Sequence, residues 1–100
     1  MENDITQIIS GFRNSSSKIY ETVYNDFSKN ISTLSREKDE NVFQQVLGGY
    51  VSKLKKELGQ EAEKILERHQ EHHLFGTMQR EMTGHISYIV SSFLLKAKSI

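Results

Sequence analysis

The residues best suited to chemistry in this sequence are its histidines, three of which stand between positions 69 and 73. If that segment is helical, His69, His72 and His73 occupy i, i+3 and i+4, so their imidazoles project from one side. Imidazole nitrogens bind zinc, copper and nickel, and His85 offers a fourth ligand from elsewhere in the chain. This spacing allows a metal site with three ligands on one helix and a fourth on a second, although structural metal sites usually gather their ligands from two elements.

The same histidines allow other interpretations. His69 and His73 continue the apolar pattern that precedes them, which is typical of half-buried residues near a helix end. Histidines held in a helix interface resist protonation, so acidification would loosen the packing. The alternatives to a metal site are therefore a pH-responsive bundle or a packing role alone.

Catalysis has little support in the sequence. There is no cysteine, no glycine-rich phosphate loop and no serine set between glycines as in a nucleophile elbow. The regularly placed carboxylates have the spacing of surface charges rather than of a catalytic pair inside a core. They are Glu57, Glu61, Glu67 and Glu71. We therefore expect a protein that is not an enzyme and needs no cofactor.

The histidines lie at the end of the longest amphipathic segment. From Val42 to His73, apolar residues recur every three or four positions, which is a helical period. One helix of this length extends about 48 Å at roughly 1.5 Å per residue, too far for so small a chain to cover in a squat globule. The segment therefore predicts partner helices along its length.

Two further segments show the same period. The first has apolar residues at i, i+3, i+4 and i+7, beginning at Ile5, and its stripe continues to Leu34. A polar run at 14–17 allows a break, but Ser16 takes a stripe position, which favours continuity. The last stripe runs from Met78 to Ala97, after a plausible stop and restart at Gly76 and Thr77. We predict helices over about 4–34, 40–74 and 77–98, in a single domain of residues 1–100.

The connection between the first two helices is predicted at 35–41, which holds no apolar residue. Gly48 and Gly49 are the weak point of the central helix, costing roughly 2 kcal/mol relative to alanine. The stripe keeps its phase from Val46 to Tyr50, which favours a continuous helix with the glycines allowing a bend or a close backbone. A turn at this pair is the alternative.

Chain length and Leu47-Gly48-Gly49 look like those of the small helical-hairpin substrates of type VII secretion, and this resemblance implies a hairpin turn at the glycine pair. The tryptophan of that family's turn has no counterpart here, because the chain contains no Trp. The family is therefore not assigned.

Composition limits the cellular location and the classes of partner that we expect. Lys plus Arg and Asp plus Glu number 13 each, so there is no general attraction for nucleic acid. The acidic start differs from a secretory signal, and the absence of cysteine fits a reducing compartment. The most apolar stretch, Ile86 to Leu95, is interrupted by serines and is about half the length of a membrane span. We expect a cytoplasmic protein that does not cross a membrane.

The fold class predicted is all-α, with long amphipathic helices in an antiparallel bundle that oligomerisation completes, because apolar residues are only 36% of the chain. The predicted function is a non-enzymatic protein–protein interaction module, with itself and another protein as partners. The alternative is a metal-binding or pH-responsive bundle. The predicted interface consists of Tyr50, Leu54, Leu58 and Phe93, supported by Ile5 and Phe12.

Overall fold

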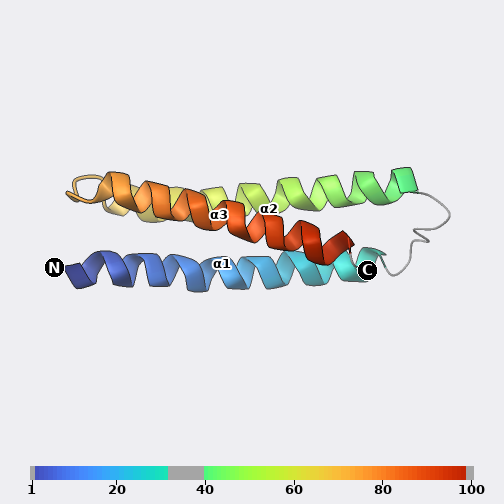
Figure 1. Cartoon of the computed structure of the whole chain (residues 1–100), viewed down its shortest axis with the longest axis horizontal. Coiled ribbons are helices and arrows are strands. Elements are labelled where there is room, and N and C mark those ends of the chain that lie inside the picture. The colour runs from blue at the N-terminus through green and yellow to red at the C-terminus, as the bar shows by residue number, and fades with distance from the viewer. Residues whose placement is uncertain (1, 32–39, 99–100) are drawn as a thin grey trace.

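The computed structural model describes residues 2–31 and 40–98, and side chains from residue 5 onward. Three helices account for most of them: α1 (Glu2–Ile31), α2 (Glu40–Arg68) and α3 (Phe75–Lys98). α1 and α3 run in one direction and α2 in the other, and each helix contacts the other two (Figure 1). The chain is thus an all-α antiparallel three-helix bundle, which confirms the predicted fold class.

The bundle is elongated, measuring 55 × 17 × 17 Å. Its helices contain 30, 29 and 24 residues, so each has neighbours along most of its length. The stripes expected to need a second chain pack against one another within this one, where their residues are buried or partly buried. Completion by oligomerisation is not shown. The expectation of a shortfall assumed a squat globule, whereas a rod of three matched helices covers long stripes with few residues.

The helix bounds differ from the prediction mainly at the end of α2. α2 starts at 40 as predicted but ends at Arg68, six residues before the predicted 74, and α3 begins at Phe75 rather than 77. The predicted end of the first helix at 34 and most of the connection at 35–41 lie outside the described residues. Gly76 is not the stop that was predicted, because it lies in the first turn of α3.

Both weak points in the helix predictions are continuous in the structure. α1 runs through the polar run at 14–17, and Ser16 is fully buried at the stripe position it was expected to take. α2 runs through Gly48 and Gly49, neither of which has a positive φ. A Cβ added at either glycine meets nothing within 4 Å, so no close backbone explains the pair within the described chain.

The centre of the core is a group of aromatic rings contributed by all three helices. The ring of Phe27 on α1 lies 6.3 Å from Phe43 and 5.6 Å from Tyr50, both on α2. It also lies 5.5 Å from Phe93 on α3. A smaller cluster towards the other end of the bundle is formed by Phe12, Ala62 and Met82. Aromatic contacts therefore fix the relative position of the three helices.

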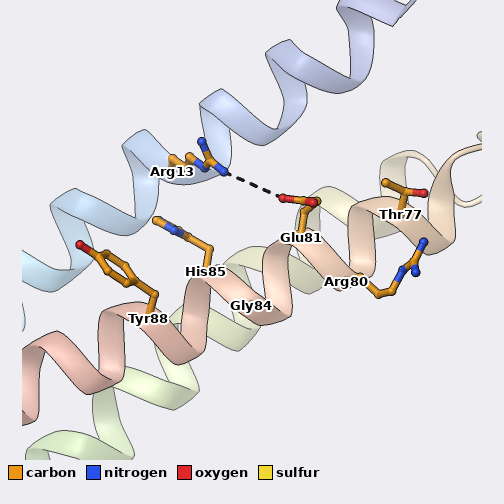
Figure 2. Close-up of a pocket in the computed structure, with 7 residues that line it drawn as sticks. All are labelled: Arg13, Thr77, Arg80, Glu81, Gly84, His85 and Tyr88. Carbon is orange, nitrogen blue, oxygen red and sulfur yellow. Dashed lines mark ion pairs between the residues drawn. The ribbon is translucent and has the colours of Figure 1, made fainter.

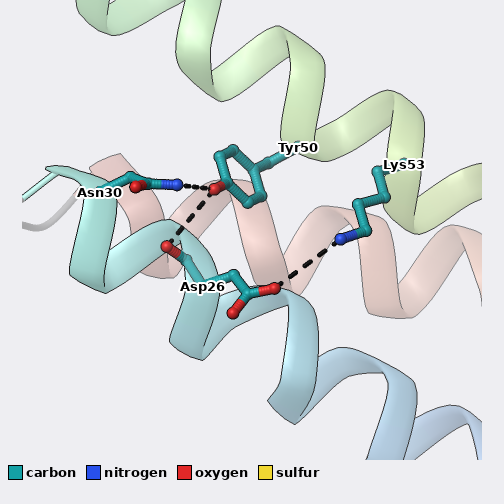
Figure 3. A network of polar contacts seen from close by, with 4 residues as sticks. All are labelled: Asp26, Asn30, Tyr50 and Lys53. Carbon is teal, nitrogen blue, oxygen red and sulfur yellow. Dashed lines mark hydrogen bonds and ion pairs between the residues drawn. The ribbon is translucent and has the colours of Figure 1, made fainter.

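A polar contact at the bundle surface ties α1 to α2 (Figure 3). The Tyr50 hydroxyl donates to the Asp26 carbonyl oxygen, 3.4 Å away, and accepts a hydrogen bond from the Asn30 amide. The Lys53 ammonium lies 3.7 Å from the Asp26 carboxylate. These contacts hold the two helices in register beside the aromatic cluster.

No helix within residues 2–31 and 40–98 combines the length and hydrophobicity needed to cross a membrane.

Candidate functional site

Four of the six residues predicted to form an interface lie inside the bundle. Phe12, Leu54, Leu58 and Phe93 are each 0% exposed within a single chain. Their contacts are with the other helices of the same chain, so another protein can reach them only if the bundle opens. The sequence identified them as residues of the apolar stripes, but it does not say which helix packs against each stripe.

The other two predicted interface residues are half-buried. Tyr50 has its ring against Phe27 and its hydroxyl in the contact with Asp26 and Asn30. Ile5 lines an open groove between the start of α1 and the start of α3. Neither residue is among the exposed large apolar side chains of the described chain.

Three of the four histidines lie in the turn between α2 and α3 rather than on a helix. This turn is closed by hydrogen bonds from the His69 amide to the Leu66 carbonyl and from the His72 amide to the His69 carbonyl, each 3.0 Å long. The Leu74 amide donates to Nδ1 of His72 at 3.0 Å, and the His72 and His73 rings stack at 4.8 Å. The i, i+3, i+4 face that suggested a metal site is therefore absent, because α2 ends at Arg68.

His85 stands apart from that turn, on α3. Its ring lies edge-on to Phe12, with centroids 5.9 Å apart, and is stacked with Tyr88 at 6.1 Å. Burial lowers the pKa of His85, and the positive charge of Arg13 lowers it further. Within residues 2–31 and 40–98, no group of three or more His, Asp, Glu or Cys side chains is arranged to hold a metal ion.

A groove of about 560 Å³ runs between α1 and α3 (Figure 2). It is lined by Arg13 of α1 and by side chains of α3 between Thr77 and Tyr88. Arg13 lies 3.9 Å from Glu81, with both side chains more than half exposed, and Arg80 points away from this pair. The groove is open, and its two arginines do not converge on one point. It therefore lacks the enclosed apolar walls and converging polar groups of a small-molecule site.

The most distinctive surface lies on the exposed side of α3, and it borders the grooves between α3 and α1. Among the described residues, the large apolar side chains that are exposed are Tyr88, at 67%, and Leu95, at 73%. They are seven residues apart, which is two helical turns, so they share one face. Residues three or four apart continue that face in both directions. We call the outer stripe the six exposed residues Glu81, Gly84, Tyr88, Ser91, Leu95 and Lys98.

Sequence reasoning missed the outer stripe because it followed the stronger pattern on the same helix. The buried stripe of α3 includes Met78, Met82, Ile89, Phe93 and Ala97. The available signal was Tyr88 and Leu95, which stand off that stripe and share a heptad position with each other. Two large apolar residues at this spacing on the polar side of a helix suggest a second contact surface.

No protein-family model, curated protein or solved structure matches this chain.

Proposed function

We propose that this chain is a non-enzymatic protein–protein interaction module that presents the outer stripe of α3 to a partner. The observation that carries the proposal is the exposure of Tyr88 and Leu95 on one face of a bundle that otherwise covers its large apolar side chains, among the described residues. Exposed apolar groups gathered on one face mark interaction sites more often than isolated ones do. Tyrosine in particular is enriched at such surfaces.

The rest of the surface supports this proposal. The groove between α1 and α3 is open and has charged walls, so it does not have the features of a small-molecule site. The outer stripe borders this groove through Glu81 and Tyr88. Equal numbers of acidic and basic residues give no general attraction for nucleic acid. Our proposal includes a cytoplasmic location, which the absence of cysteine supports.

Site-specific photo-cross-linking tests the proposal. A photoreactive amino acid placed at Tyr88 or Leu95 should form covalent adducts with protein in the cells that make this chain. The matched control is Lys55, an exposed residue of α2. Adducts at 88 and 95 but not at 55 would support the outer stripe as the docking surface. The absence of adducts at 88 and 95, or equal adducts at all three positions, would reject it.

A second candidate function, a response to pH, has one observation in its favour. Nδ1 of His72 accepts the Leu74 amide hydrogen bond, and a proton on Nδ1 removes that acceptor. The charged ring would also stack on His73. The groove that His72 lines is completed by Gln7, Ile8 and His69, and His69 is the other titratable residue in it. Hydrogen exchange of the Leu74 amide, compared as protection factors at about pH 7.5 and about pH 5.5, tests this. Equal protection at both values would reject it.

A further inference from the structure

The outer stripe has the spacing of a coiled-coil seam. Its residues follow one another at intervals of three, four, three, four and three, from Glu81 to Lys98. This alternation is the heptad spacing with which two helices pack side by side. The stripe would extend about 26 Å along α3, at roughly 1.5 Å per residue, so the face suits one partner helix.

From this spacing we infer that the partner is a second copy of this chain, whose α3 docks antiparallel on the outer stripe across a two-fold axis. This inference rests on the proposed function, because it names the occupant of the same surface. A two-fold contact requires a self-complementary patch, in which residue i meets residue j and j meets i. The outer stripe meets that requirement in both shape and charge.

The shape requirement is met by pairs of one large and one small residue. With the axis midway between Tyr88 and Ser91, Tyr88 of one copy faces Ser91 of the other. Gly84 of one copy then faces Leu95 of the other. Each large apolar side chain therefore meets a small residue, which lets the two helices approach closely. A parallel pairing would instead put Tyr88 against Tyr88 and Gly84 against Gly84.

Gly84 fits this arrangement, and it shares its free surroundings with the other five glycines of the chain. It lies inside α3 without a positive φ, and a Cβ added there meets nothing within 4 Å. The packing within the chain therefore gives no reason for a residue that weakens a helix relative to alanine. The proposed dimer gives a reason for the glycine: Gly84 faces Leu95 of the second copy, and the missing Cβ makes room for the leucine.

The charge requirement is met at the two ends of the stripe. In the same register, Glu81 of one copy faces Lys98 of the other, and this pair occurs twice in the dimer. Glu81 also lies 3.9 Å from Arg13, but both side chains are more than half exposed, so this is a weak surface pair. A parallel pairing would place like charges opposite each other, which favours the antiparallel register.

Sedimentation equilibrium of the purified chain, from about 1 μM to about 1 mM, is the first test, since single-helix contacts associate weakly. We expect reversible dimers of twice the 11.6 kDa chain mass. Leu95→Ala should weaken dimerisation at least about tenfold, because each dimer loses two buried leucines. A chain that stays monomeric throughout, or a dimer that Leu95→Ala leaves unchanged, would overturn the inference.

Gly84→Ala and Gly48→Ala form a matched pair of glycine variants. Both sites are exposed, helical and free of neighbours within 4 Å of an added Cβ, but Gly48 lies on α2. At high dilution both variants should unfold at higher temperature than the natural chain. Only Gly84→Ala should also weaken dimerisation. Equal dimerisation of the two variants would contradict the close contact at Gly84.

Disulfide trapping tests the register, because the chain has no cysteine of its own. Gly84→Cys and Leu95→Cys chains, mixed in equal amounts under mild oxidation, should give mainly the mixed disulfide. Gly48→Cys provides the background level. Same-site disulfides at least as abundant as the mixed one would rule out the antiparallel register.

A charge reversal tests the ends of the stripe. Glu81→Lys should weaken the dimer, and Lys98→Glu added to that variant should restore it.

The photo-cross-linking experiment separates the two levels of the proposal. Adducts at 88 and 95 with twice the chain mass support both. Adducts only with a different protein, together with a monomeric purified chain, keep the proposed function and overturn the second copy. No adducts at either position reject both.

Discussion

The ring of His85 on α3 meets the ring of Phe12 on α1 edge-on, with 71° between the two planes. Nε2 of His85 is buried and has no hydrogen-bond partner among the described residues. Burial lowers the pKa of His85, and Arg13 lowers it further. The packing of α1 against α3 therefore favours the neutral ring.

Acidification should consequently destabilise the bundle. The unfolded chain, with an ordinary histidine pKa of about 6.5, takes up the proton before the folded chain does. The stabilisation from neutral His85 is complete above about pH 6.5 and is lost as the pH falls towards the lower folded-state pKa. Urea unfolding across this range should show a shallower pH dependence for His85→Gln than for the natural chain.

The control for that experiment is His73→Gln, which changes an exposed residue of the turn. It should keep the pH dependence contributed by His85. If His85→Gln and the natural chain lose stability equally on acidification, the neutral ring at this position does not contribute.

Ser16→Ala should stabilise the bundle by about 1 kcal/mol. Ser16 is 0% exposed, and its hydroxyl is buried with no hydrogen-bond partner among the described residues. Alanine removes the unsatisfied oxygen and is the best helix former. Ser15→Ala is the control, because its hydroxyl donates to the Gly11 carbonyl oxygen at 3.0 Å. A lower urea midpoint for Ser16→Ala than for the natural chain would show that the hydroxyl is satisfied in solution.

Leu54→Ala and Leu95→Ala should differ sharply in the isolated chain. Leu54 is fully buried between the helices, so its loss should cost about 2–5 kcal/mol of unfolding free energy. Leu95 is 73% exposed, and its replacement should change that free energy by less than about 0.5 kcal/mol. The measurement is urea unfolding at a concentration low enough to keep the chain monomeric. Equal losses would contradict the difference in burial between the two leucines.

Tyr50→Phe should cost about 1 kcal/mol. The variant keeps the ring that packs 5.6 Å from Phe27, but it loses the hydroxyl that bonds to Asp26 and Asn30. Thermal unfolding at neutral pH measures this loss, with Tyr88→Phe as the control at an exposed site. A midpoint for Tyr50→Phe as high as that of the control would mean that the polar contact adds nothing to stability.

Local pattern was enough to predict the three helices and the residues on their apolar faces. The phase of a stripe depends only on neighbours along the chain, so Ser16 and the Gly48–Gly49 pair could be placed inside helices without knowing what packs on them. The helical pattern also ran on to His73, because nothing local stops it. α2 nevertheless ends at Arg68, and after the turn α3 lies along the other two helices (Figure 1).

Only the tertiary structure decided which apolar residues are covered. Phe12, Leu54, Leu58 and Phe93 are equally good candidates for a core or an interface as long as the partner stripe is unknown, and packing made them core. The same packing left Tyr88 and Leu95 outside. Burial depends on which helices face each other across the bundle, and sequence periodicity within one helix carries no information about that choice.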